Sequence, residues 1–264
     1  MASEAVLRLG AFIGIFVLLA LWEVWAPARA RIFTRRRRWV TNWTISAVNA
    51  GVTALMALAL GAAAVLAALD AAERGIGLFN RLAWPEWLEG VIVFVVLDFA
   101  IWLQHLVSHR WYPLWRLHRV HHVDREFDVT TGIRFHPIEI ALSMLWKIAL
   151  VYALGASVAA VIVFEIVLNG VTMFNHSNIR LAPPVERWLR RVVVTPDMHR
   201  VHHSIDRQEH DANYGFNFSF WDRLFRTYVA QPRLGHERMT IGLGDHQTDE
   251  PVRVGWSLAF PFRR

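Results

Sequence analysis

A stretch of 26 consecutive residues without a charged side chain, positions 44–69, is the strongest constraint on how this chain can fold. As a helix, an apolar run of this length crosses a hydrocarbon core of roughly 30 Å. A second run, residues 5–26, is interrupted only by Arg8 and Glu23. We interpret it as a retained span rather than a cleaved signal peptide, because Glu23 and two tryptophans lie at its end, where a small-residue cleavage site would be expected. With 55% hydrophobic and 19% charged residues, the expected solvent of the chain is a bilayer.

An arginine-rich segment between these two runs sets the expected orientation. It contains Arg29, Arg31 and the run Arg35–Arg38, which is typical of a cytoplasmic loop between spans and less typical of a nucleic-acid patch. Residues 89–107 would return the chain to the cytoplasm. Residues 138–174, divided at Gly155, are long enough for two further spans. We therefore predict an all-α polytopic bundle of four or five spans with a helical cap on the cytoplasmic side and no nucleic-acid partner.

Histidines recur in short groups at helical spacing. The word HRVHH occurs twice, and HLVSH precedes the first copy. Positions three and four apart share one helix face, so the three histidines of each HRVHH spread over roughly 100° of the surface. The two adjacent histidines of each copy diverge by the same angle and can serve two different ions. The candidate metal ligands are His105, His109, His118, His121, His122, His176, His199, His202 and His203.

Imidazole suits iron, zinc, copper and nickel, and this many imidazoles exceed what one ion of four to six ligands accepts. The sequence therefore predicts a dimetal site, with all histidine groups on one side of the membrane. Two alternatives remain. A divalent-metal transporter or metal-binding membrane protein would place ligands near mid-bilayer, and a zinc hydrolase would need only about three ligands. We expect His210, His236 and His246 at the surface.

Polar residues on the spans continue the histidine faces. Asp98 lies eleven residues before His109, and Glu165 and Asn169 precede His176 at offsets of eleven and seven. Eleven residues rise roughly 16 Å, so both acids would lie within the membrane. They are candidates to hydrogen-bond the outer nitrogen of a ligand histidine, and a buried contact between helices is the alternative.

Five motifs resemble those of the fatty acid hydroxylase superfamily, in its sterol desaturase-like branch. They are HLVSH, HRVHH, RFHPIE, FNHSNI and the second HRVHH, followed by NYGFNFSFWDRLFRTY, and together they cover residues 97–228. The resemblance implies a non-haem di-iron site that uses O2 to hydroxylate or desaturate a lipid. It also implies that the nine histidines above are the iron ligands.

The resemblance leaves one coordination position open, because some relatives have a histidine where this chain has Thr172. His136 or a water held by Asn178 would fill that position, which makes these two residues candidate catalytic groups. Asp222, within an aromatic segment that we interpret mainly as packing, would pair with Arg223, Arg226 or a ligand histidine.

The expected organisation has three parts: residues 1–88 with the first spans and basic loop, 89–230 with the histidine motifs, and a C-terminal tail 231–264. The chain has no haem-binding HPGG segment and no glycine-rich dinucleotide motif. The electrons for a di-iron oxygenase would therefore come from a separate ferredoxin, cytochrome b5-like protein or reductase. Of 28 basic residues only Lys147 is a lysine, which is typical of a GC-rich bacterial genome, and we expect an inner-membrane location.

Overall fold

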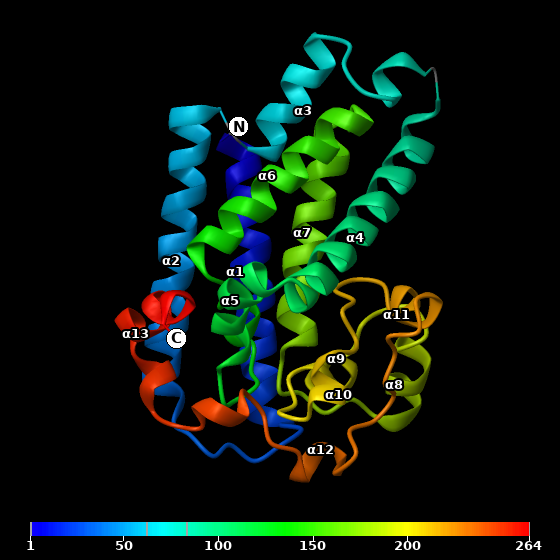
Figure 1. Cartoon of the computed structure of the whole chain (residues 1–264). Helices are drawn as coiled ribbons and strands as arrows, with labels where there is room; N and C mark the ends of the chain where they lie inside the picture. The colour runs from blue at the N-terminus through cyan, green and yellow to red at the C-terminus, as the bar shows by residue number, and fades with distance from the viewer. Residues whose placement is uncertain (1, 62, 83, 264) are drawn as a thin grey trace.

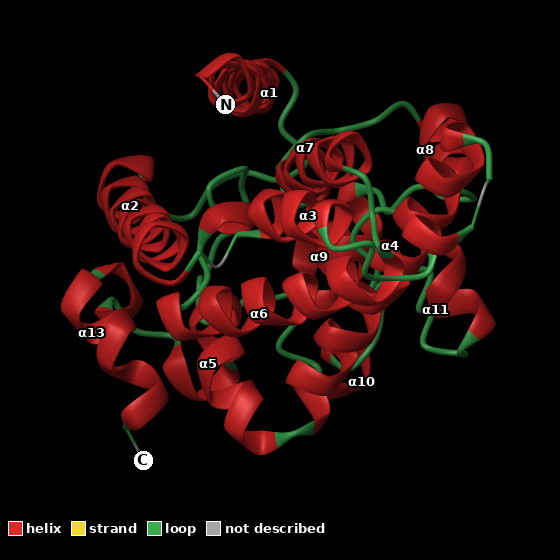
Figure 2. Ribbon diagram, turned by 90° about the horizontal axis from the view of Figure 1, so that it is seen from above, coloured by secondary structure: helices red, strands yellow, loops and turns green. Residues whose placement is uncertain are grey.

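The computed structural model describes residues 2–61, 63–82 and 84–263, and it is helical (Figure 1). Within these residues, β structure is limited to three isolated bridges. Among the described residues, five helical segments are long and apolar enough to cross a membrane. They are α1 (Ala2–Trp25), α2 (Arg35–Leu60), whose candidate span continues to Glu73, α4 (Glu86–Arg110), α6 (Pro137–Leu154) and α7 (Val158–Asn175). Figure 2, which looks down on the bundle, shows α1 and α2 at its edge and α4, α6 and α7 closer to its centre. The prediction of an all-α, multi-pass membrane protein is confirmed.

The charge-free run of residues 44–69 is divided between two helices. α2 ends at Leu60, and Gly61 closes it with a left-handed φ of 60° and an N–H bond to the carbonyl of Met56. α3 (Ala64–Glu73) follows and packs against α6 and α7, where Ala64, Ala67 and Ala68 are buried. The run therefore does not form one continuous helix, because a left-handed residue ends α2 within it, although the candidate span Arg35–Glu73 covers the whole run.

α6 and α7 form the hairpin that the division at Gly155 predicted. Gly155 adopts a left-handed φ of 64°, and a Cβ built on it would lie 2.8 Å from the Asn80 side chain and 2.9 Å from the carbonyl oxygen of Ile76. Only glycine combines this backbone conformation with so close an approach. The turn lies at the opposite end of the bundle from α5 and α9 (Figure 1).

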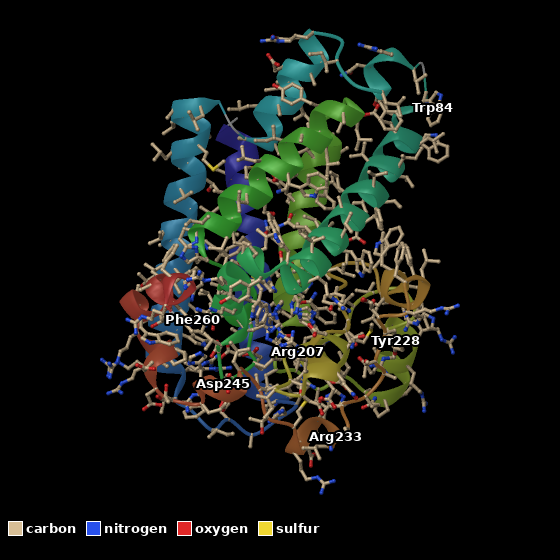
Figure 3. All side chains as sticks on the ribbon, in the orientation of Figure 1. Trp84, Arg207, Tyr228, Arg233, Asp245 and Phe260 are labelled. Carbon is tan, nitrogen blue, oxygen red and sulfur yellow. The ribbon has the colours of Figure 1, made fainter. Side chains whose placement is uncertain are left out.

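Short helices cover the other end, which we call the histidine end: the lower end in Figure 1, where α5, α9 and α10 lie. Figure 3 labels five of its side chains, Arg207, Tyr228, Arg233, Asp245 and the buried Phe260, whereas Trp84 lies at the opposite end. The α-helices here are α5 (Tyr112–His122), α8 (Pro183–Leu189), α9 (Pro196–His202), α10 (Arg207–His210), α11 (Phe220–Leu224), α12 (Gly235–Arg238) and α13 (Val254–Ala259). The 3-10 turns are η2 (Thr131–Ile133), η3 (Gly244–His246), η4 (Glu250–Val252) and η5 (Phe260–Phe262), while η1 (Phe79–Arg81) lies beyond α3.

A buried network of charges ties the base of α2 to the segment that follows α5. Arg38 makes two hydrogen bonds of 2.7 Å to Asp124 and one of 2.7 Å to Asp128. Arg134 is buried and donates to the Asn42 side chain, at 2.7 Å, and to the hydroxyl of Ser257 near the C-terminus, at 2.8 Å. Residues 123–136 are thus held between α2 and the C-terminal segment, directly beside the histidines.

Candidate metal centre

Nine buried histidines form two adjacent clusters at the histidine end. In each cluster the ligand-capable nitrogens lie within 4.8 Å of one another. The five-histidine cluster consists of His105, His109, His118, His122 and His202, and the four-histidine cluster of His121, His176, His199 and His203. The rings of His122 and His203 stack with centroids 4.5 Å apart, so the clusters are in contact. Each HRVHH copy divides its adjacent histidines between the clusters, in keeping with their divergence on a helix.

Local sequence explains why these histidines converge. α4 carries two of them one turn apart, and Pro113 in the first turn of α5 starts the helix that carries three more. In α9 the side chain of Thr195 caps the helix by accepting from the backbone N–H of Met198 at 3.4 Å. His176 follows the last residue of α7. The two copies of HRVHH thus lie on separate short helices that face each other across the site.

The outer nitrogens of several rings have hydrogen-bond acceptors that fix the tautomer. Nδ1 of His105 lies 2.7 Å from the carbonyl oxygen of Tyr214, Nδ1 of His176 2.7 Å from that of Thr172, and Nδ1 of His202 2.6 Å from that of Ala212. Similar contacts join His121 to the carbonyl of Arg134 at 3.2 Å and His118 to a carboxylate oxygen of Glu139 at 2.6 Å. Carbonyl and carboxylate oxygens only accept, so Nδ1 carries the proton and Nε2 keeps its lone pair.

This assignment leaves lone pairs facing one another. Nε2 of His121 lies 3.0 Å from Nε2 of His176, and Nε2 of His105 lies 3.1 Å from Nε2 of His118. Two acceptors at this distance repel unless a cation lies between them. In addition, Nε2 of His202 and both ring nitrogens of His203 are buried without a hydrogen-bond partner. The residues of both clusters therefore fit metal ions, which would satisfy these nitrogens.

The protonation state also suits metal binding. Burial, assisted by neighbouring imidazoles, lowers the pKa of His121, His122, His199, His202 and His203 well below the ordinary value of 6.5. Burial lowers the pKa of His176 to about 3. At neutral pH these rings are neutral, which is the form of imidazole that coordinates metals.

The structure places the two candidate catalytic residues outside the clusters. His136 caps α6: its Nδ1 accepts from the N–H of Ile138 at 3.2 Å, and its Nε2 lies 3.2 Å from the carbonyl oxygen of Leu258. The Asn178 side chain accepts from the N–H of Arg29 at 3.1 Å and donates to its carbonyl at 3.0 Å. In the structure the ring nitrogens of His136 and the side-chain amide of Asn178 thus have other partners, and their place at the coordination position left open at Thr172 stays a prediction.

The polar residues expected to support the histidines contact other groups. Asp98 accepts from the indole N–H of Trp221, at 2.8 Å, and from the backbone N–H of Phe218, because α11 packs against this face of α4. Glu165 forms ion pairs with Lys147 and Arg8. In the described residues the hydrogen bonds and ion pairs of both acids thus go to groups other than histidine, as in the alternative of a buried contact between helices.

Asp222 also contacts groups other than the predicted ones. Asp222 does not pair with Arg223, Arg226 or a histidine; it accepts from the indole N–H of Trp102 at 3.1 Å and from the backbone N–H of Tyr214 at 2.9 Å. It therefore acts on His105 indirectly, by fixing the backbone whose carbonyl accepts from that ring. Asn169 lines a cavity beside the histidines.

Sequence reasoning missed three residues at the site. His210, expected at the surface, is buried, with its ring centroid 4.5 Å from that of His122 and 4.9 Å from that of His109. Asp211 lies 3.5 Å from Nδ1 of His109, and Glu139 contacts His118. His210 follows His202 by eight residues across a turn, so helical spacing gave no signal. Glu139 could have been suspected from its place in the RFHPIE motif.

Taken together, the fold and the site define a multi-pass membrane protein with two touching clusters of neutral imidazoles suited to transition-metal ions. The model of the fatty acid hydroxylase family matches residues 90–227. The chain belongs to the fatty acid hydroxylase family, as its motifs predicted.

Curated relatives support this assignment. Ornithine lipid hydroxylase OlsE of Rhizobium tropici is 31% identical over 188 residues, which cover 67% of this chain and 54% of the relative. Alkylglycerol monooxygenase of Homo sapiens is 28% identical over 187 residues, covering 69% of this chain and 39% of the relative. The chain thus spans about half or less of the length of these relatives. No solved structure matches.

Proposed function

We propose that the chain is a membrane-bound, non-haem di-iron oxidoreductase that uses O2 and external electrons to hydroxylate a lipid. The observation that carries this proposal is the pair of touching imidazole clusters with unsatisfied inward nitrogens, in a chain whose relatives are a lipid hydroxylase and an alkylglycerol monooxygenase. Those names favour hydroxylation over the desaturation that we also considered.

The two clusters would each hold one iron, with the nine histidines as ligands. When bound, the iron pair would supply the activation of O2 that C–H oxidation needs. The contribution of the protein is to orient the rings: His105, His121 and His176 are fixed through Nδ1 by backbone carbonyls, and His118 by Glu139. Such partners set the direction of the coordinating lone pair and raise its basicity.

Aromatic side chains shield the clusters from water. The ring of Phe135 stacks on His121 with centroids 4.4 Å apart, and the ring of Phe216 lies 4.9 Å from that of His105. Phe135, Phe216, His105 and His118 all line the cavity that opens beside the histidines, so a substrate in this cavity would meet imidazoles on one side and apolar rings around it. Excluding water in this way protects a reactive centre from side reactions.

A lipid substrate would enter from the bilayer, and the electrons would come from a separate ferredoxin, cytochrome b5-like protein or reductase. The arginines between α1 and α2 lie at the histidine end, which supports a cytoplasmic position of the site, reachable by such a donor (Figure 1). The relatives give no support to the transporter alternative, whose ligands would lie near mid-bilayer.

Metal analysis of detergent-purified protein tests the proposal. We expect two irons per chain in the wild type, and loss of most iron and of turnover in His202→Ala and His121→Ala. His246→Ala, at the same end but outside both clusters, should retain its iron and its turnover. Normal iron and turnover in either cluster variant would contradict the proposal.

Lipids from a strain with the gene and a strain without it then identify the reaction. A mass gain of one oxygen that depends on the gene is the expected result. Loss of two hydrogens instead would indicate desaturation, and identical lipid profiles would count against a lipid oxidase.

A further inference from the structure

The nine cluster histidines are too buried for an ion to reach them directly from solvent. None of them is more than 6% exposed. The cavity beside His105 and His118 is an unsuitable route, because its walls come mainly from the membrane-spanning helices α1, α2, α4, α6 and α7. A divalent cation loses far more hydration energy than a lipid does on entering such surroundings. An ion from solution therefore needs another route to the clusters.

A third group of ligand-capable side chains lies against the five-histidine cluster. It consists of His109, His210 and Asp211, whose ligand-capable atoms lie within 4.8 Å of one another. His109 belongs to both the cluster and this group. His210 ends α10, which packs against α9 at the histidine end (Figure 1). His210 is 8% exposed and the side chain of Asp211 is 22% exposed, so this group lies closer to solvent than the cluster with which it shares a ring.

His210 and Asp211 lie against cluster rings whose outer nitrogens make no hydrogen bond. Nδ1 of His109 and Nδ1 of His122 are both buried in this way among the residues that the structure describes. A carboxylate oxygen of Asp211 lies 3.5 Å from Nδ1 of His109, and the ring centroid of His210 lies 4.5 Å from that of His122. Burial lowers the pKa of His210 to about 3, so its ring is neutral at neutral pH and able to bind a metal ion.

The carboxylate of Asp211 lies at the boundary between solvent and cluster. One of its oxygens faces His109, and the other pairs with Arg207 at 3.2 Å. The side chain of Arg207 is 87% exposed, and ion pairs with so exposed a partner contribute little to stability. A divalent cation that arrives from solution can therefore displace Arg207 from Asp211 at little cost.

We propose that His210 and Asp211 form an entry site, where a divalent transition-metal ion from solution binds before it moves to the five-histidine cluster. The carboxylate attracts the ion, and the imidazole of His210 supplies a first nitrogen ligand. The cluster offers more imidazoles, which such ions prefer to carboxylate oxygen, so the ion passes inward along His109, the ring that both groups share. The inference rests on the proposed function for the identity of the ion as iron, but the entry site itself requires only that the cluster bind a metal.

Rapid mixing of the metal-free full chain in detergent with cobalt(II) ions tests the proposal. Cobalt bound by imidazoles absorbs visible light, so the absorbance reports the rate of uptake, and metal analysis at the end gives the amount bound. Asp211→Asn should slow the uptake roughly tenfold, because a charge at the mouth of a site raises association rates by about this factor or more. His210→Gln removes a ligand and should slow the uptake as well. Glu237→Gln and His246→Gln, which make the same changes elsewhere at the histidine end, should leave the rate unchanged.

Arg207→Gln gives a prediction of the opposite sign. Without the guanidinium group, Asp211 is free to meet the incoming ion, so the uptake should become faster. The matched control is Arg180→Gln, which removes another exposed arginine, 64% exposed, at a distance from the cluster and should not change the rate. Because Arg207 is exposed, this variant should fold even if a variant of the buried His210 does not.

The rates of uptake and release separate an entry site from a supporting role. A residue on the path of the ion changes both rates by the same factor and leaves the affinity for cobalt unchanged. A residue that only orients His109 or His122 would instead lower the affinity and speed the release of cobalt to a chelator, without slowing its uptake. That second pattern, or an unchanged rate of uptake in all three variants, would overturn the inference.

Lipid oxidation by the iron-loaded protein distinguishes this inference from the proposed function. Slower uptake in the entry-site variants, in a chain that oxidises no lipid, would refute the proposed function and leave the entry site standing. Two irons per chain and normal turnover, with uptake unaffected by the variants, would refute the inference alone.

Discussion

Gly132 lies against His176 where a side chain does not fit. A Cβ built on it would lie 2.9 Å from the carbonyl oxygen of Thr172 and 3.3 Å from Nδ1 of His176. The hydrogen bond between these two groups, 2.7 Å long, fixes the direction of the His176 ring. A glycine in the segment after α5 therefore controls the orientation of a histidine at the end of α7.

Gly132→Ala should lower iron affinity by roughly tenfold or more, the typical effect of disturbing the partner of a metal-bound imidazole. The matched control is Gly90→Ala, where an added Cβ meets nothing within 4 Å. Iron retained during graded chelation measures the effect. Equal retention by both variants would show that the contact is unimportant.

At the residue scale, the sequence identified which histidines gather but not what holds them. The spacing of HLVSH and HRVHH is local information, and it was sufficient to group eight of the nine; His176 was added because it closes the last apolar region. The acceptors for their Nδ1 atoms are mostly backbone carbonyls of distant segments, such as those of Tyr214 and Ala212, and sequence does not encode such contacts visibly. The partner of Asp98 likewise depends on how α11 packs, because its carboxylate accepts from Trp221 of that helix.

At the scale of elements, the C-terminal segment supports the metal centre. The backbone carbonyl of Pro251 and the hydroxyl of Ser257 accept hydrogen bonds from Arg134 at 3.0 and 2.8 Å. The carbonyl of Arg134 in turn accepts from His121. Sequence reasoning found no chemistry after residue 231, because this segment acts through packing and backbone oxygens rather than through a recognisable motif.

Arg134→Met should destabilise the protein by about 3 kcal/mol or more, because several buried acceptors lose their donor. It should also lower iron content, since the acceptor of His121 would shift. Ser257→Ala removes one partner and should cost only about 1 kcal/mol. Thermal unfolding in detergent gives the comparison. If Arg134→Met lowered the thermal stability no more than Ser257→Ala does, the result would contradict this account.

The ends of the membrane-spanning helices were also only partly predictable from local sequence. Gly155 was a visible break between α6 and α7, and it is the turn. Gly61 was overlooked, since an apolar run without charges looked continuous. Whether a glycine in such a run ends a helix depends on what packs nearby, and here α3 packs against α6 and α7.

For the whole molecule, the concentration of neutral imidazoles at one end makes the stability of the metal-free chain depend on pH. His176 and His210 have a folded pKa of about 3, against an ordinary value of 6.5. Between these values the unfolded chain binds protons that the folded chain does not. The stability that these two neutral histidines contribute is therefore fully present above pH 6.5 and is lost as the pH falls toward 3.

We expect the melting temperature of chelator-treated protein to fall between pH 7.5 and pH 5. Differential scanning fluorimetry in detergent measures it. Replacing His210 with Gln should reduce the slope, because one of the groups that takes up a proton on unfolding is removed. A melting temperature that does not change over this range would contradict the expectation.

The division of each HRVHH copy between the two clusters also has a thermodynamic consequence. His121 and His122 are consecutive in one helix, and so are His202 and His203 at the end of another, yet the members of each pair serve different clusters. An ion in either cluster would immobilise both helices. Binding of a second ion would then cost less conformational entropy, because its ligands would already be ordered. If both clusters bind ions, filling of the two positions would thus be cooperative, and chains holding a single ion would be rarer than independent filling gives.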